Sequence, residues 1–103
     1  MTPRFDQLVG GFAEGDAISQ EARRMQHLAR DAGYVSEIFC PPEHVSPGTK
    51  ERCQPLENYT AGRSDIVVYH YGLATPAGVT FTDSSAKRIL RYHNITPAHF
   101  FDV

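Results

Sequence analysis

The stretch FDQLVGGFAEGDAISQEARRMQHLARDAGYVSEIF, residues 5–39, decides the fold. The run Phe5–Val9 is apolar enough for a strand, and it stops at the pair Gly10-Gly11. After a glycine loop and a helical pattern, Tyr34–Phe39 predicts a second strand, which a nearby proline pair would end. A strand, loop, helix and strand of this length predict a right-handed crossover between two parallel strands.

The middle of this stretch has a helical period from Ala17 to about Ala32, because apolar residues recur at steps of three and four. Asp16 is a good N-cap for that helix, and Gly33 stands where a glycine commonly ends one. The predicted apolar stripe consists of Ile18, Ala22, Met25, Ala29 and Ala32, and the predicted solvent side consists of Arg23, Arg24, Gln26 and Arg30. The sequence therefore predicts a helix that packs one face against a sheet.

The rest of the chain predicts two more strands. Asp65–His70 contains a continuous apolar run, which is typical of a strand buried on both faces of a parallel sheet, and Arg88–Tyr92 forms the last strand. Residues 73–85, between them, are ambiguous: a proline suits the first position of a short helix, but Gly78, Val79, Thr80 and Thr82 are weak helix formers. Residues 41–64 form an irregular loop with one helical turn expected over Leu56–Tyr59. The predicted fold class is α/β: a Rossmann-like, mostly parallel sheet with flanking helices.

Length and composition limit the function classes. The chain has 103 residues, a formal net charge of −2 and 41% hydrophobic residues, which indicate a single folded domain over residues 1–103 rather than a nucleic-acid binder. It has no apolar run long enough to span a membrane and no visible secretory signal, so a cytoplasmic location is expected. With two cysteines, a disulfide framework is not expected there.

Polar side chains follow the two later strands at the point where each ends. His70 closes one, and His93 and Asn94 follow the other. In an open α/β sheet, ligands bind beyond the carboxyl ends of the strands, so these residues are candidate substrate contacts. A histidine there can serve as a general base or bind a phosphate or a sugar hydroxyl. The alternative is that each histidine orients a turn by a hydrogen bond to a loop carbonyl.

The glycine loop is a second candidate. Backbone N–H groups of Gly10 and Gly11, next to a helix N-terminus, could hold a phosphate. The spacing matches neither GxGxxG nor a P-loop, so a plain strand-to-helix turn is the alternative. Asp16 would repel an anion at the cap, unless it binds a sugar hydroxyl instead. Cys40, His44 and Cys53 lack the spacing of a zinc site, and no metal or cofactor is expected.

Several of these strings together resemble a known family. GGFAEGDAIS-x-EA, IFCP, VVYHYG and above all RILRYHNITPAHFF are similar to the N-terminal part of bacterial GT-B glycosyltransferases, in the large retaining group related to glycosyltransferase family 4. The likeness covers most of the chain except residues 43–63 and 73–85. Its most specific part is YHNITP followed by paired phenylalanines.

The resemblance implies two Rossmann-like domains that face each other across a cleft. The N-terminal domain would recognise the acceptor, and the C-terminal domain would hold the nucleotide sugar, which is the donor substrate. Carried onto this sequence, His93 would contact the reacting sugar or phosphate, Gly10 and Gly11 would approach the donor or acceptor, and His70 would line the cleft wall. Such enzymes have several hundred residues, so these 103 residues are expected to be an N-terminal fragment or a truncated relative, an incomplete half of a GT-B fold.

Three functional hypotheses follow. In the first, the whole enzyme transfers a sugar from a nucleotide sugar to an acceptor hydroxyl, and residues 1–103 alone are inactive. In the second, the chain is a non-catalytic module that binds a nucleotide, a sugar or a protein partner. In the third, an uncovered sheet edge and an apolar surface favour self-association into a homo-oligomer.

Overall fold

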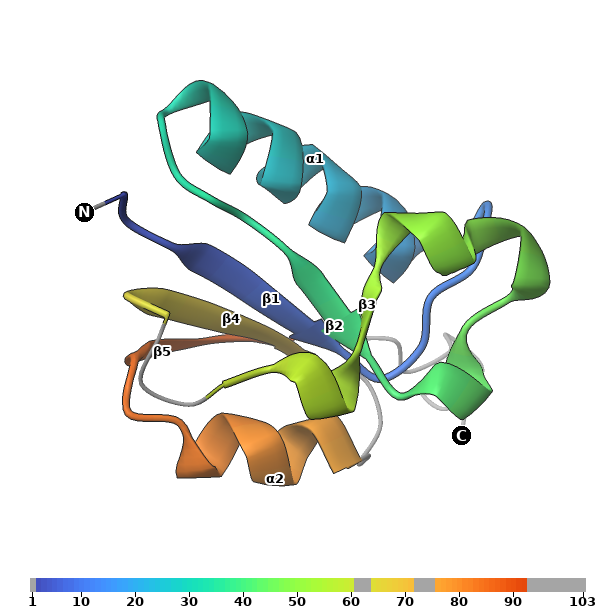
Figure 1. The fold of residues 1–103 in the computed structure, drawn as a ribbon. Helices are drawn as coiled ribbons and strands as arrows, with labels where there is room; N and C mark the ends of the chain where they lie inside the picture. The colour runs from blue at the N-terminus through green and yellow to red at the C-terminus, as the bar shows by residue number, and fades with distance from the viewer. Residues whose placement is uncertain (1, 61–63, 72–75, 93–103) are drawn as a thin grey trace, which may run out of the picture.

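The computed structural model describes residues 2–60, 64–71 and 76–92 of the chain, with two helices around one sheet (Figure 1). The strands are β1 (Phe5–Val9), β2 (Ile38–Cys40), β3 (Gln54–Pro55), β4 (Ile66–Tyr71) and β5 (Lys87–Tyr92). The α-helices are α1 (Ala17–Asp31) and α2 (Pro76–Asp83). Three short 3₁₀ helices, η1 (Pro42–His44), η2 (Pro47–Arg52) and η3 (Leu56–Asn58), lie between β2 and β4.

The five strands form one sheet in the order β3-β2-β1-β4-β5, and every neighbouring pair is parallel. The helix α1 lies on one face of this sheet and α2 lies on the other (Figure 1). This arrangement confirms the predicted α/β, Rossmann-like fold class. The order in which strands are added to the sheet changes direction between β1 and β4. From β1 the chain passes through α1 to β2 on one side, and from β4 it passes through α2 to β5 on the other side.

The helix α1 begins and ends at the predicted residues. The carboxylate of Asp16 accepts a hydrogen bond from the Ser19 backbone N–H at 2.9 Å, as an N-cap does. Gly33, just after the helix, has a φ of +97°, which glycine adopts without a steric penalty.

The buried face of α1 differs from the predicted stripe. It consists of Ser19, Ala22, Gln26 and Ala29, whereas Ala32 is exposed. The prediction that Gln26 faces solvent is therefore wrong. Its amide Nε2 donates to the Ser36 carbonyl at 3.0 Å, and this bond offsets the cost of burying the amide.

The segment after β1 and α1 also departs from the prediction. The strand expected over residues 34–39 is regular only from Ile38, although an isolated bridge joins Val35 to Arg4. The short strand β3 lies within the stretch predicted to be irregular, and it pairs with β2. Two residues, one of them a proline, carry no strand pattern, and proline is tolerated there because β3 is at an edge. The turn expected over Leu56–Tyr59 is η3.

The sheet carries a core cluster on each face. The cluster on the α1 side contains Val9, Phe12, Ala22, Ile38, Cys40 and Cys53. The cluster on the other side contains Leu8, Phe39, Tyr59, Val67, Tyr69 and Ala77. The alternation of Leu8 and Val9 between the two clusters shows that β1 is buried on both faces, as is expected of a central parallel strand. Neither helix in the described ranges is long and apolar enough to cross a membrane.

Candidate functional site

The candidate site lies where the carboxyl ends of β1 and β4 meet. These strands are neighbours, with Val9 paired to His70, and the helices that follow them, α1 and α2, lie on opposite faces of the sheet (Figure 1). At such a change in strand order, open α/β sheets bind ligands beyond the carboxyl ends of the strands. The glycine loop follows β1, and His70 and Tyr71 end β4. The sequence-predicted residues Gly10, Gly11, Asp16 and His70 therefore come to one end of the sheet.

The start of the glycine loop is held against the loop that contains η1. His44 Nδ1 donates to the Gly10 carbonyl at 3.0 Å, and the Phe12 backbone N–H donates to the His44 carbonyl at 3.1 Å. Gly10 and Gly11 do not have positive φ angles. A Cβ added at Gly11 would meet the His44 carbonyl oxygen at 3.6 Å, an ordinary contact. The backbone angles at position 11 and the room around it would therefore both accept a residue with a side-chain Cβ.

The N-terminus of α1 is already occupied by a carboxylate. Oδ2 of Asp16 accepts from the Ser19 backbone N–H at 2.9 Å and from Ser19 Oγ at 2.8 Å. Ser19 Oγ in turn accepts from the Ala13 backbone N–H at 3.0 Å. A phosphate placed at this helix end would have to displace a negatively charged group from the donors it needs. Hydroxyl groups face no such repulsion, because they can donate to the carboxylate.

His70 lies in a polar network beneath this edge. Its side chain is fully buried, and its Nε2 lies 2.7 Å from Gln7 Oε1. Gln7 Nε2 donates to the Ala22 carbonyl at 2.8 Å, which fixes the amide with its oxygen toward the histidine. Because that oxygen can only accept, Nε2 of His70 carries the hydrogen. The other ring nitrogen of His70, Nδ1, lies 3.8 Å from Glu21 Oε2.

Glu21 links α1 to β5. Its two carboxylate oxygens accept from Arg91 Nε at 2.9 Å and Arg91 Nη2 at 3.2 Å, a two-bond arrangement. The hydrogen bond from Arg91 to Glu21 and the attraction of its charge raise the pKa of Arg91 above its ordinary value. Glu21 is partly exposed and His70 is buried, so Glu21 is the member of this pair that a ligand at the sheet edge can reach. Sequence reasoning did not single out Glu21, because a glutamate in the second turn of a helix has no distinctive pattern.

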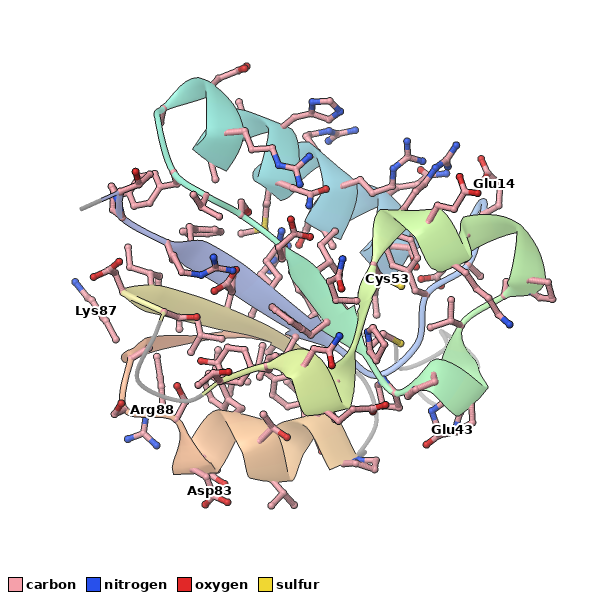
Figure 2. All side chains as sticks on the ribbon, in the orientation of Figure 1. Glu14, Glu43, Cys53, Asp83, Lys87 and Arg88 are labelled. Atoms are coloured by element: carbon pink, nitrogen blue, oxygen red, sulfur yellow. The ribbon has the colours of Figure 1, made fainter. Side chains whose placement is uncertain are left out.

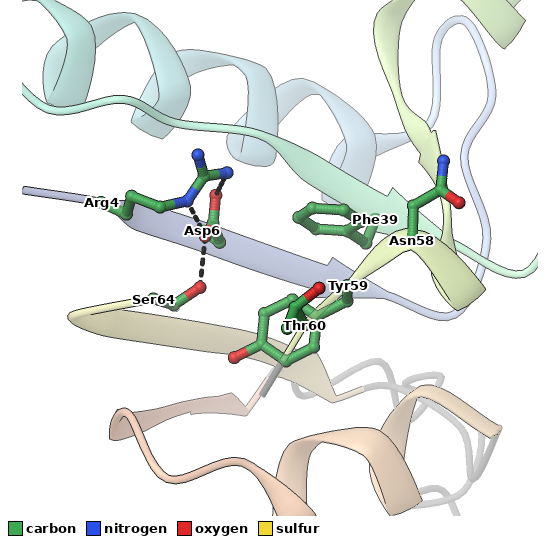
Figure 3. Close-up of a pocket in the computed structure, with 7 residues that line it drawn as sticks. All are labelled: Arg4, Asp6, Phe39, Asn58, Tyr59, Thr60 and Ser64. Atoms are coloured by element: carbon green, nitrogen blue, oxygen red, sulfur yellow. Dashed lines mark hydrogen bonds and ion pairs between the residues drawn. The ribbon is translucent and has the colours of Figure 1, made fainter. Parts of the chain in front are cut away.

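A second polar cluster surrounds Asp6, near the start of β1 (Figure 3). The buried carboxylate of Asp6 accepts from Arg4 Nε and Nη2, both at 3.1 Å, and from the Glu37 backbone N–H at 3.1 Å. Ser64 Oγ also donates to it. A cavity of about 90 Å³ lies beside it, lined by Arg4, Asp6, Phe39, Asn58, Tyr59, Thr60 and Ser64. The carboxylate of Asp6 already accepts four hydrogen bonds. Asp6 therefore has a structural role: it links β1 to the residues that precede β2 and β4.

The two cysteines are buried thiols on the α1 side of the sheet. Burial raises the pKa of Cys40 to about 12, with further contributions from Cys53 and Glu43, and burial raises the pKa of Cys53 as well. Such thiols are protonated at neutral pH and are poor nucleophiles. Within the described residues, no three His, Cys, Asp or Glu side chains are grouped closely enough to hold a metal ion.

The remaining sequence-predicted residues, His93 and Asn94, lie outside the described residues. Comparisons of the chain with protein families, with curated proteins and with solved structures gave no match. What the edge can bind therefore rests on its own side chains and backbone groups.

Proposed function

We propose that the sheet edge formed by the carboxyl ends of β1 and β4 binds a hydroxyl-rich ligand, a sugar or the sugar part of a nucleotide. In the fuller proposal, the chain is the acceptor-side segment of a GT-B glycosyltransferase that transfers a sugar from a nucleotide sugar to an acceptor hydroxyl. The proposal of a hydroxyl-rich ligand rests on the strand order. It brings the glycine loop after β1 and the end of β4 together at the point where the strand order changes direction. The fuller proposal rests on the likeness of the sequence strings to that family.

The side chains at the edge suit hydroxyl groups better than phosphate. Asp16 occupies the helix N-terminus, and Glu21 adds a second carboxylate near the end of β4. Carboxylates that accept hydrogen bonds from sugar hydroxyls give orientation without requiring a charged ligand. The half-exposed guanidinium of Arg91, already bonded to Glu21, can donate to a sugar oxygen from the same position.

The test is a titration of the folded chain with glucose, UDP and GDP, followed by amide NMR shifts and calorimetry. We expect saturable shifts at Gly10, Gly11 and Asp16 with at least one sugar-containing ligand. The variant Glu21→Gln keeps the size of the side chain and should weaken that binding. The matched control, Glu57→Gln, changes an exposed glutamate of η3 and should have no effect. Flat traces for every ligand would contradict the proposal.

A non-catalytic binding module is the second candidate, and one observation favours it. His70 is completely buried and bonded to Gln7, so it positions Glu21 and the sheet edge rather than meeting a substrate directly. We expect residues 1–103 alone to show binding but no sugar transfer. Turnover of a nucleotide sugar by the purified chain would exclude the binding-only function.

A further inference from the structure

The strand β5 has an uncovered outer edge in the described part of the chain. It pairs with β4 on one side and stands last in the strand order. All six of its residues are exposed, and the exposed fractions reach 42% for Ile89, 55% for Leu90 and 57% for Tyr92. The helix α2 packs mainly on β4 and β1. An exposed apolar edge strand is a template for pairing with another strand.

The positively charged residues of β5 limit which strands can pair with this edge, and in which register. Lys87 and Arg88 reach outward at the start of the strand, Arg88 on the side of α2 (Figure 2). Arg88 Nη1 donates to the Thr82 carbonyl at 2.8 Å, and Arg91 is bonded to Glu21. Edge cations usually prevent a strand from pairing with a copy of itself, because like charges would stand opposite each other. A second copy therefore fits only in a register that keeps the cations apart.

When two copies of β5 pair antiparallel about a two-fold axis, residues that stand opposite each other lie on the same face of the sheet. The axis must then pass through a residue, and the two residues nearest the middle of the strand are Ile89 and Leu90. Centring the axis on Ile89 places Lys87 opposite Arg91 of the second copy, an unfavourable pair. Centring it on Leu90 places Arg88 opposite Tyr92 and Ile89 opposite Arg91, so no cation in the described strand faces another. An arginine over a tyrosine ring is itself attractive. Tyr92 is already stacked on Tyr71, with ring centroids 5.7 Å apart, and so presents an ordered ring.

We infer that two copies of this chain pair through β5, antiparallel, about a two-fold axis that passes through Leu90. The pairing joins the two sheets into one and covers the three exposed apolar side chains of the strand. It is isologous, as most homodimer interfaces are. The carboxyl end of β1 does not take part in this interface, because β4 lies between β1 and β5 in the sheet.

Cysteine cross-linking of the full chain tests the register. Leu90→Cys places a thiol on the axis, where directly opposite Cα atoms come about 4.5–5.5 Å apart, within disulfide range. We expect this variant to form a covalent dimer rapidly under mild oxidation. Ile89→Cys would face Arg91 of the second copy and should cross-link slowly. The native thiols are buried and do not compete. Equal cross-linking by both variants contradicts this register.

Solution mass, measured by light scattering over a wide concentration range, tests the interface itself. We expect the wild type to form dimers and Leu90→Lys to raise the dissociation constant at least about tenfold. The control is Leu28→Lys, since Leu28 on α1 is 63% exposed, similar to Leu90. It should leave the dimer intact, and circular dichroism verifies that both variants fold. A wild type that stays monomeric, or a dimer lost in Leu28→Lys instead, overturns the inference.

Discussion

At the scale of single residues, Asp16 has two roles that mutation can separate. Its carboxylate caps α1 through Ser19 and also places a negative charge at the N-terminus of that helix. We expect Asp16→Ala to lower the free energy of unfolding by about 1 kcal/mol, as loss of an N-cap usually does, and Asp16→Asn to restore most of it. Urea denaturation measures both. Asp31→Ala, at the other end of α1, is the control and should change stability little. An unchanged stability in Asp16→Ala would contradict the capping role.

The buried thiol of Cys40 predicts a loss of stability at alkaline pH. Its pKa is raised by burial from an ordinary 9.0 to about 12 in the folded chain. Below pH 9 the thiol is protonated in both states. Between the two pKa values the unfolded chain releases this proton and the folded chain keeps it, so unfolding becomes easier by about 1.4 kcal/mol per pH unit.

The measurement for Cys40 compares urea denaturation of the wild type and Cys40→Ala at neutral pH and above pH 9. Titration of other groups affects both proteins and cancels in the difference. We expect the variant to be less stable at neutral pH, because a buried side chain is lost, but to lose less stability as the pH rises. Parallel declines in the two proteins would show that this thiol does not titrate as its burial requires.

At the scale of elements, the glycine that ends α1 gives a clean prediction. Gly33 has a φ of +97°, and a Cβ there would meet no atom within 4 Å beyond those of its two chain neighbours. Gly33→Ala should therefore cost about 1–2 kcal/mol through backbone strain alone. Gly48→Ala is the matched control, since Gly48 also has open space around it but no positive φ. Thermal unfolding distinguishes the two, and equal stabilities would show that Gly33 is not required by its conformation.

The elements that the sequence predicted well are those with a local signal. Asp16 and Gly33 are caps that act within a few residues, and the apolar run of β4 needs no partner to be visible. The proline that begins α2 was only one side of an ambiguous pattern, since weak helix formers follow it. The elements that were missed depend on contacts across the chain. The strand β3 exists because β2 offers it an edge, and Gln26 is buried because the Ser36 carbonyl meets it.

At the scale of the whole molecule, the candidate site follows from strand order more than from any motif. The sequence predicted that His70 ends a strand, but only the pairing of β1 with β4 puts Gln7 against it. Glu21 joins them from a helix, and Arg91 joins Glu21 from β5, 70 residues later in the chain. Long-range hydrogen bonds of this kind leave no periodicity in a sequence, so the polar network could not be predicted from it.

If two chains pair through β5, unfolding must depend on protein concentration, because folded dimers dissociate as they unfold. Each tenfold rise in concentration then adds about 1.4 kcal/mol per dimer to the free energy of unfolding. For two chains of this length, that corresponds to a rise in the melting temperature of about 3 °C per tenfold. Calorimetry at several concentrations measures it. Leu90→Lys should lower the melting temperature at each concentration at which the wild type is dimeric, and Leu28→Lys should leave the dependence as in the wild type, since only the first alters the strand that joins the two sheets. A wild-type melting temperature that does not change with concentration would show that the sheet edge stays unpaired.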